Sequence, residues 1–245
     1  MTDDKKTVRL NRYLAMCGVG ARRKVEEYVV AGKVTINGET VTEPGRQVAE
    51  TDVVIYEGRE ISPLEQKYLI FNKPSGILSA VEDSREQTVI DILPPELEKY
   101  RLFPVGRLDR ESEGLIILTN DGMFSQELIH PSMGITKTYE VELRRPLSEE
   151  KLIEWTQGVE AEGLFIKPIS VRRLGRDPLQ CWFEVVLGEG IKREIRLMAR
   201  ALGTDVRRLI RRRIGMLELK ELISGSYISV TKEEIWSYIK DGKIV

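Results

Sequence analysis

A short apolar run near the middle of the chain is its clearest hydrophobic feature. The run is Leu115-Ile116-Ile117-Leu118, and the turn-forming residues 119–122 follow it directly. An uninterrupted apolar run of this length between turn signals is typical of a strand that is buried on both faces. The ten residues before it contain two glycines and five charged side chains, namely Arg107, Asp109, Arg110, Glu111 and Glu113. We therefore expect a cluster of opposite charges at the start of a core strand.

The first 57 residues have the hydrophobic pattern of a small separate module. Helical and alternating spacings of apolar residues predict two helices and three strands, at residues 10–17, 22–30, 34–36, 40–42 and 53–56. Asn37-Gly38 lies between the first two strands and is a strong signal for a hairpin turn. Residues 58–66 show no periodicity and contain Gly58 and Pro63, so we expect a linker there.

Residues 67–245 are expected to form one larger domain. The pattern predicts strands at 68–71, 115–118, 138–143, 169–173 and 181–187, and helices at 123–129, 191–202 and 232–238. Asn120 or Asp121 is expected to cap the first of these helices, and Thr231 with Glu234 forms a capping box for the last. Because strands and helices mix without strict alternation, the expected class is α+β.

The composition adds few constraints and excludes several kinds of site. Apolar residues make up 41% and charged residues 31% of the 245, which is typical of a soluble globular protein. No apolar stretch approaches the length of a membrane span, and the N-terminus lacks a secretory signal. Cys17 and Cys181 are far apart, so we expect a reduced, cytoplasmic protein. The single histidine, His130, is expected at a helix end, and we expect neither a metal nor a cofactor.

The net charge of −1 conceals a separation of charge along the chain. Residues 1–33 carry eight basic and four acidic side chains, residues 190–213 carry nine basic and two acidic ones, and the remainder sums to −12. Two basic segments in an otherwise acidic chain indicate a nucleic-acid partner. Basic residues at 22–24 would begin a helix, where positive charge opposes the helix dipole, so phosphate binding is favoured for them. Arginines at 207, 208 and 211–213 would repel one another without an anion, which also favours phosphate contact.

Three segments of the N-terminal module, Arg9–Leu14, Gly18–Arg23 and Gly32–Gly38, resemble those of an S4 RNA-binding domain. Ala21 departs from that pattern, since related sequences often have a serine there that caps the second helix. The loss of this cap should cost about 1 kcal/mol. The resemblance implies that the two-helix face binds the backbone of structured RNA, with contacts from Arg9, Arg12, Arg22, Arg23, Lys24 and Lys33.

Four further segments, in order and at matching spacing, resemble the small-subunit-type (RsuA-like) ribosomal RNA pseudouridine synthases. Residues 106–122 are similar to the catalytic motif, and 68–78 to a Lys-Pro-x-Gly segment. Residues 137–141 are similar to a Lys-x-Tyr strand, and 188–196 to the last motif. The resemblance implies a catalytic domain built on a mixed, mostly antiparallel sheet with flanking helices, and conversion of uridine to pseudouridine without a metal or redox cofactor.

The resemblance also implies roles for individual residues. Asp109 would be the nucleophile, attacking either the base or the sugar C1′, and Arg196 would hold it in an ion pair. Tyr139 would stack on the target uracil, and Arg107 would contact the RNA near the flipped-out nucleotide. Further RNA contacts are expected from the basic residues of the C-terminal segment, namely Lys192, Arg193, Arg207, Arg208, Arg211 and Arg212.

Each of these residues also has an interpretation without function. A charged loop such as 105–114 is usually solvated. Tyr139 alone would be a half-buried strand residue, and Lys192, Arg196 and Arg200 could form one solvated helix face. Lys73-Pro74 is expected to be a turn that shapes the cleft rather than to carry a reactive lysine.

The expected partner is ribosomal RNA, either free or within an assembly intermediate. We expect the protein to be a monomer that does not associate with a membrane. A non-catalytic RNA-binding protein with a decayed synthase domain is the alternative. A second alternative is a different enzyme that acts on uracil, although the sequence lacks the histidine or metal cluster that hydrolysis or deamination would need. The sequence does not identify the uridine that is modified.

Overall fold

The chain divides into two compact units. The computed structural model describes residues 7–175, 181–188 and 190–245. The first unit is formed by the chain up to Gln66 together with Lys99–Arg101, and the second by Lys67–Glu98 and Leu102–Val245. Each unit has its own apolar core, so each is described by itself.

The first unit packs two helices against short strands. Its elements are β1 (Thr7–Arg9), α1 (Leu10–Met16), α2 (Arg22–Val30), β2 (Val34–Ile36), β3 (Glu39–Val41), β4 (Gln47–Ala49), β5 (Val54–Tyr56) and β6 (Arg59–Glu60). Leu10 and Leu14 of α1 pack with Val25 and Val29 of α2 in a fully buried core. The predicted helices and hairpin are confirmed. β6 lies within residues 58–66, which are expected to form a linker, and it pairs with β5, which precedes them.

The second unit contains the longer strands. They are β7 (Tyr68–Lys73), β8 (Phe103–Val105), β9 (Glu113–Thr119), β10 (Lys137–Leu143), β11 (Val159–Ala161), β12 (Leu164–Ile166), β13 (Ser170–Arg173), β14 (Trp182–Leu187), β15 (Val206–Ile214), β16 (Leu217–Glu218), β17 (Tyr227–Val230) and β18 (Lys243–Ile244). Its helices are α3 (Gly122–Ile129), α4 (Glu149–Gln157), α5 (Glu194–Ala201) and α6 (Lys232–Asp241), with the 3-10 turn η2 (Pro131–Met133). A further 3-10 turn, η1 (Pro95–Tyr100), begins in this unit and ends in residues of the first.

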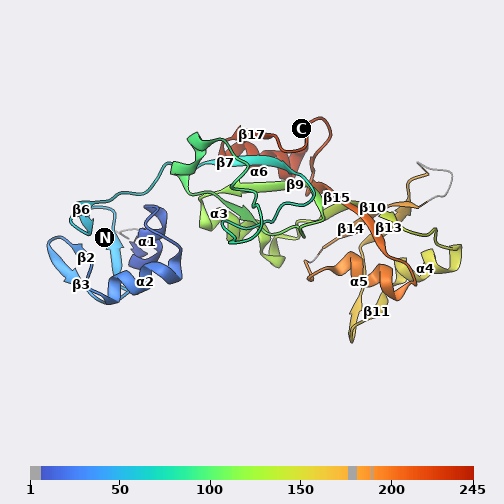
Figure 1. Cartoon of the computed structure of the whole chain (residues 1–245), viewed down its shortest axis with the longest axis horizontal. Helices are drawn as coiled ribbons and strands as arrows, with labels where there is room; N and C mark the ends of the chain where they lie inside the picture. The colour runs from blue at the N-terminus through green and yellow to red at the C-terminus, as the bar shows by residue number, and fades with distance from the viewer. Residues whose placement is uncertain (1–6, 176–180, 189) are drawn as a thin grey trace, which may run out of the picture. The chain divides into compact units, whose positions relative to one another are not determined.

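One sheet runs through the whole second unit, in the order β13-β14-β10-β15-β9-β7-β17. Its pairs are antiparallel except β15 with β9 and β16 with β18, so the predicted mixed, mostly antiparallel α+β architecture is confirmed. In Figure 1, β7, β9 and β17 form one half with α3 and α6, and β10, β13, β14 and β15 form the other with α4 and α5. The two halves meet where β9 lies beside β15.

Each half of the sheet has its own core. Phe124 of α3 and Ile235 of α6 pack against β7 and β9 in one half, and Trp155 of α4 and Met198 of α5 pack against β10 and β14 in the other. The apolar run 115–118 is fully buried, as the sequence predicts for a strand covered on both faces. Within the described ranges, no helix has the length and apolar character needed to cross a membrane.

The helix ends test the sequence predictions most sharply. Asp121 caps α3 by accepting from the backbone N–H groups of Met123 and Phe124, and Thr231 with Glu234 forms the predicted capping box of α6. The predicted start of α5 at Ile191 is wrong. The helix begins at Glu194 because Arg193 adopts a left-handed conformation with φ of 59°, which α-helical geometry does not allow.

Candidate active site

The loop that carries Asp109 connects β8 to β9 and is braced by the segment that follows β7. Gly76 donates its backbone N–H to the Arg110 carbonyl at 2.8 Å, and the Ser75 hydroxyl donates to the Glu111 carbonyl at 3.2 Å. The Leu108 N–H donates to the Ser79 hydroxyl at 3.2 Å. The loop is thereby tied to a second segment of the chain along its length, which holds Asp109 at a fixed place.

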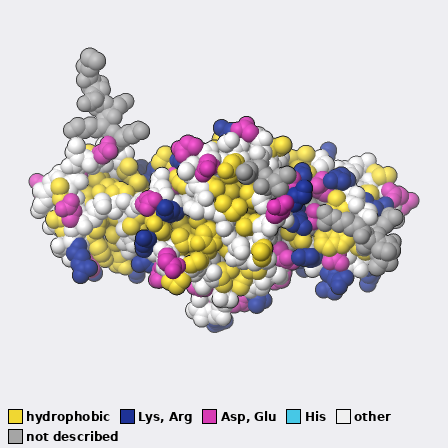
Figure 2. Space-filling view, turned by 90° about the horizontal axis from the view of Figure 1, so that it is seen from above, with side chains coloured by type: hydrophobic (Ala, Val, Ile, Leu, Met, Phe, Trp, Pro, Cys, Tyr) yellow, Lys and Arg dark blue, Asp and Glu magenta, His cyan; other side chains and the backbone are white. Residues whose placement is uncertain are grey.

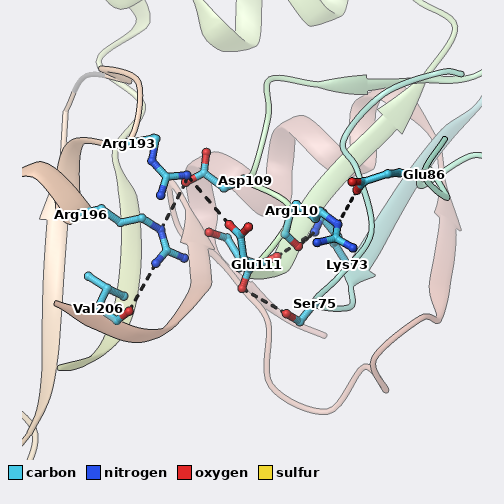
Figure 3. Close-up of polar contacts among 10 residues, drawn as sticks. Lys73, Ser75, Glu86, Asp109, Arg110, Glu111, Arg193, Arg196 and Val206 are labelled. Atoms are coloured by element: carbon cyan, nitrogen blue, oxygen red, sulfur yellow. Dashed lines mark hydrogen bonds and ion pairs between the residues drawn. The ribbon is translucent and has the colours of Figure 1, made fainter. Parts of the chain in front are cut away.

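Lys73, the last residue of β7, also contacts this loop. Its side chain is fully buried, and Nζ donates to the carbonyls of Pro74, Arg110 and Ser112 at 3.0, 3.2 and 2.8 Å. Two of these carbonyls, those of Arg110 and Ser112, lie on either side of Glu111 in the loop. Figure 3 shows Lys73 beside Arg110. Burial lowers the pKa of Lys73 to about 8, although neighbouring carboxylates, first Glu111, act to raise it.

Asp109 faces two arginines of the α5 region. Arg193 Nη1 and Arg196 Nε each lie 3.5 Å from Asp109 Oδ2, and Figure 3 shows both guanidinium groups pointing toward the carboxylate. Arg193 Nη1 also lies 4.0 Å from Glu111 Oε2. The side chain of Arg196 is 12% exposed and that of Asp109 is 27% exposed, so this contact is screened less than a surface ion pair. The two guanidinium groups place positive charge beside the carboxylate.

Asp109 lies on a cavity of about 900 Å³ that both halves of the sheet line. That volume lies in the range of about 300–1,000 Å³ that is usual for ligand sites. Tyr139, which is half-buried on β10, and Arg107 and Lys192, which are exposed, also line it. Lys137, two residues before Tyr139, donates to the Ile135 carbonyl at 2.8 Å, and burial lowers its pKa. The structure thus brings Asp109, Arg107, Tyr139 and Arg196 to one cavity.

A close backbone contact joins the two halves of the sheet beside the cavity. Gly114 of β9 pairs with Arg211 of β15, and its φ is 103°. A Cβ on Gly114 would lie 2.4 Å from the Arg211 carbonyl oxygen, so only glycine fits there. Arg211 itself is 5% exposed, lines the cavity, and donates from Nε to the Leu115 carbonyl at 2.6 Å.

The arginine run of residues 207–213 is not the unpaired cluster that the sequence suggests. It forms β15, and four of its arginines meet carboxylates, in the pairs Arg207–Glu142, Arg208–Glu113, Arg212–Glu140 and Arg213–Glu218, at 2.8 to 3.1 Å. The inference that these arginines need an external anion is therefore corrected, because neighbouring strands supply the anions. Figure 2 likewise shows basic and acidic side chains interspersed on the face in view.

The basic residues predicted to bind RNA in the first unit lie on or near its helices. Arg9, Arg22, Arg23, Lys24 and Lys33 are exposed and Arg12 is half-buried. Ala21 precedes α2 without a side-chain cap, as expected. Lys24 forms an ion pair with Glu27 at 3.1 Å, and Lys33 with Glu57 at 2.6 Å. Arg22 and Arg23 have no ion pair among the described residues, which leaves their charge for a partner.

Sequence reasoning missed two functional features of the site. Lys73 was expected to belong to a turn that shapes the cleft, yet its ammonium group holds the Asp109 loop. Arg193 was expected to contact RNA, yet it also faces Asp109. The sequence signal for the role of Lys73 is its position as a lysine at the end of an apolar strand. Among the described residues, no group of three or more histidine, cysteine or acidic side chains could hold a metal ion.

Comparisons with known proteins show the family to which the chain belongs. A model of the family described as RNA pseudouridylate synthase matches residues 67–201, and a model of the S4 domain matches residues 8–54. The chain is 37% identical over 231 residues to a Bacillus subtilis protein named uncharacterized RNA pseudouridine synthase YtzG, covering 93% of this chain and 97% of that protein.

Two further matches extend over most of the chain. Ribosomal large subunit pseudouridine synthase B of Bacillus subtilis is 33% identical over 229 residues, with 93% of each chain covered. A solved structure described as a pseudouridylate synthase has a TM-score of 0.66 and 28% identity, and the match covers 94% of this chain and 98% of that chain.

Proposed function

The chain belongs to the RNA pseudouridylate synthase family, and we propose that it converts a specific uridine of ribosomal RNA into pseudouridine with Asp109 as the nucleophile. The observation that carries this assignment is the position of Asp109, on a braced loop at the cavity and opposite two arginines. The related synthase B is named for the large ribosomal subunit, so RNA of that subunit is the first substrate to test.

The reaction is an isomerisation that needs no other reactant. The bond between C1′ and N1 of the uridine breaks, the uracil turns, and C1′ forms a bond to C5. The proton on C5 then leaves to solvent and N1 takes up a proton, so the product has the same composition as uridine. A carboxylate can assist by attacking either the base or C1′, and both routes require it to be ionised beside the nucleoside. Asp109 lies on the cavity that would hold the nucleoside, opposite two guanidinium groups.

Arg196 acts through Asp109 and so is a positioning residue. Its Nη1 donates to the Val206 carbonyl at 3.4 Å, which orients the guanidinium group while Nε faces the carboxylate. Tyr139 supplies an aromatic face on which uracil can stack. Arg107, exposed at the rim of the cavity, suits the role of contacting the RNA from which the nucleotide is flipped.

The S4 unit supports the same function from a separate part of the chain. We assign to it the docking of structured RNA through Arg9, Arg12, Arg22, Arg23, Lys24 and Lys33, whereas the second unit performs the chemistry. We further propose that the protein acts as a monomer in the cytoplasm, on ribosomal RNA that is free or part of an assembly intermediate. Light scattering of the purified protein tests whether it is a monomer.

Release of tritium from RNA that carries tritium at uridine C5 tests the proposed chemistry. The wild-type protein should release it from ribosomal RNA, and Asp109→Asn should abolish release while RNA binding persists. Glu111→Gln is the matched control, because it removes a carboxylate from the same loop. It should keep activity within about threefold, since an exposed pair contributes little.

The competing class is an RNA-binding protein without catalysis. This alternative predicts that the wild-type protein binds RNA tightly but releases no tritium from RNA of either ribosomal subunit. That result would overturn the proposal. Full activity of Asp109→Asn would be compatible with a pseudouridine synthase but would show that Asp109 is not its nucleophile.

A further inference from the structure

A second pocket lies next to the cavity that holds Asp109, and we infer that it binds a phosphate of the RNA backbone. The pocket has a volume of about 480 Å³ and is lined by Arg144, Arg193, Arg196, Arg200, Asp205 and Val206. Arg144 and Arg200 have no role in the site described above. The inference rests on the proposed function, because it deepens how the same site recognises RNA.

The arginines of this pocket come from two elements. Arg193, Arg196 and Arg200 lie at the start and along one face of α5, at spacings of three and four residues. Arg144 directly follows β10, and its backbone N–H donates to the Asp205 carbonyl at 2.8 Å. The backbone at both ends of the pocket is thereby tied together, so the cationic groups are held around one space rather than spread over a loop.

The positive charge of the pocket exceeds its negative charge. Asp205 is its single acidic lining residue, and its Oδ1 lies 3.6 Å from Arg200 Nε. Arg144 has no ion pair among the described residues. Arg196 has a buried Nη2 without a hydrogen-bond partner in the part of the chain that the structure describes. Arg193 and Arg196 also face Asp109, and Arg193 faces Glu111, so four guanidinium groups share three carboxylates and Arg144 is the one without a carboxylate partner in the described ranges. An anion in the pocket would balance this remaining positive charge.

The chemistry and position of the pocket favour a phosphodiester. Guanidinium groups present paired donors that match the oxygens of a phosphate group. Arg193 and Arg196 line both pockets, so they stand between the phosphate site and Asp109. An RNA whose uridine occupies the larger cavity must pass its backbone close to these side chains. The phosphate of the target nucleotide or of its immediate neighbour therefore fits the second pocket.

The variant Arg144→Gln tests this inference with ribosomal RNA as the substrate, and Arg145→Gln is its control. Arg145 is the next residue and is exposed, but it does not line the pocket. Arg144→Gln should raise KM about tenfold with kcat unchanged, because a phosphate contact is made in both the bound substrate and the transition state. It should also lower the slope of log affinity against log salt by about one. Arg145→Gln should change neither.

Phosphate-ethylation interference locates the contact. Ribosomal RNA ethylated at random phosphates is separated into fractions bound and not bound by the protein. Ethylation of one phosphate within a nucleotide or two of the modified uridine should prevent binding by wild type and Arg145→Gln. It should no longer do so with Arg144→Gln. Arg200→Gln gives a second variant with the same expected pattern if Arg144→Gln does not fold, as judged by circular dichroism.

Two results would overturn the inference. One is a KM and salt slope in Arg144→Gln and Arg200→Gln equal to those of Arg145→Gln. The other is an ethylation pattern that is the same for all these proteins. Either can occur while the wild-type protein still releases tritium from RNA, in which case the proposed function stands and the phosphate site alone fails.

Discussion

At the scale of single residues, the site depends on charged groups that hold one another. The Lys73 ammonium group holds the backbone on both sides of Glu111, and Arg193 and Arg196 hold the carboxylate of Asp109. A neutral amine has one fewer N–H group to donate than an ammonium group, so loss of the Lys73 proton leaves one of its three carbonyls without a donor. The protonation of a residue that never touches the substrate should therefore affect the rate.

We expect kcat to fall as the pH is raised through about 8, the pKa to which burial lowers Lys73. Stability should respond in the opposite direction. Between pH 8 and the ordinary value of 10.5, the unfolded chain binds more protons at this lysine than the folded chain. The contribution of Lys73 to the free energy of unfolding therefore rises over that range. A pH profile of kcat and urea titrations at the same pH values measure the two trends.

Lys73→Met provides the control for this pH dependence. The variant lacks the ammonium group, so kcat should be about tenfold lower at pH 7 and should no longer fall through pH 8. An unchanged pH profile in Lys73→Met would show that another group causes the loss of activity.

At the scale of elements, the fold places the site where two half-sheets join through Gly114 and Arg211. The contact depends on the absence of a side chain, because a Cβ on Gly114 would lie 2.4 Å from the Arg211 carbonyl oxygen and 2.8 Å from its nitrogen. The loop with Asp109 enters β9 directly before this contact. Separation of β9 from β15 should therefore displace the loop from the arginines that face it.

Gly114→Ala should lower the free energy of unfolding by about 3 kcal/mol or more, through the clash and the strain of a positive φ. Gly122→Ala is the matched control, because Gly122 begins α3 with open space around it. It should be neutral or stabilising by up to about 1 kcal/mol. Urea unfolding of both variants measures the difference, and equal stabilities would contradict the role given to the junction.

The elements also show which features a sequence can predict. Strand β9 and the caps of α3 and α6 depend on residues close together in the chain, and their prediction is confirmed. The start of α5 depends on the left-handed conformation of Arg193, which the apolar spacing did not reveal. The pairing of the β15 arginines and the contacts of Lys73 depend on which strands become neighbours. Those contacts join residues far apart in sequence, so local pattern could not predict them.

At the scale of the whole molecule, the chain combines an S4 unit, to which we assign RNA docking, with a unit that matches the RNA pseudouridylate synthase family. In the docking unit, Arg22 and Arg23 begin α2, where their charge opposes the helix dipole and the preceding Ala21 provides no cap. Such an arrangement costs helix stability, which is consistent with the RNA phosphate contact that we propose for these residues. The sequence resemblance to S4 domains led to the same interpretation, and the S4 family model matches residues 8–54.

Replacing Arg22 and Arg23 by Ala should weaken RNA binding and lower the slope of log affinity against log salt by about two. Chemistry at saturating RNA should survive, because neither residue belongs to the catalytic unit. Filter binding at several salt concentrations and tritium release at saturating RNA measure the two effects. Arg46→Ala is a control from the same unit, outside both helices. A full salt slope in the double variant would exclude this surface as the docking face.

The central claim is that Asp109 makes pseudouridine at a specific position of ribosomal RNA. The most direct test maps pseudouridines by carbodiimide modification and primer extension in ribosomal RNA from cells that lack the protein. One position should be uridine in those cells, pseudouridine again when the wild-type protein is restored, and uridine still when Asp109→Asn is supplied at the same level. An unchanged pseudouridine map in cells without the protein, or restoration by Asp109→Asn, would contradict the claim.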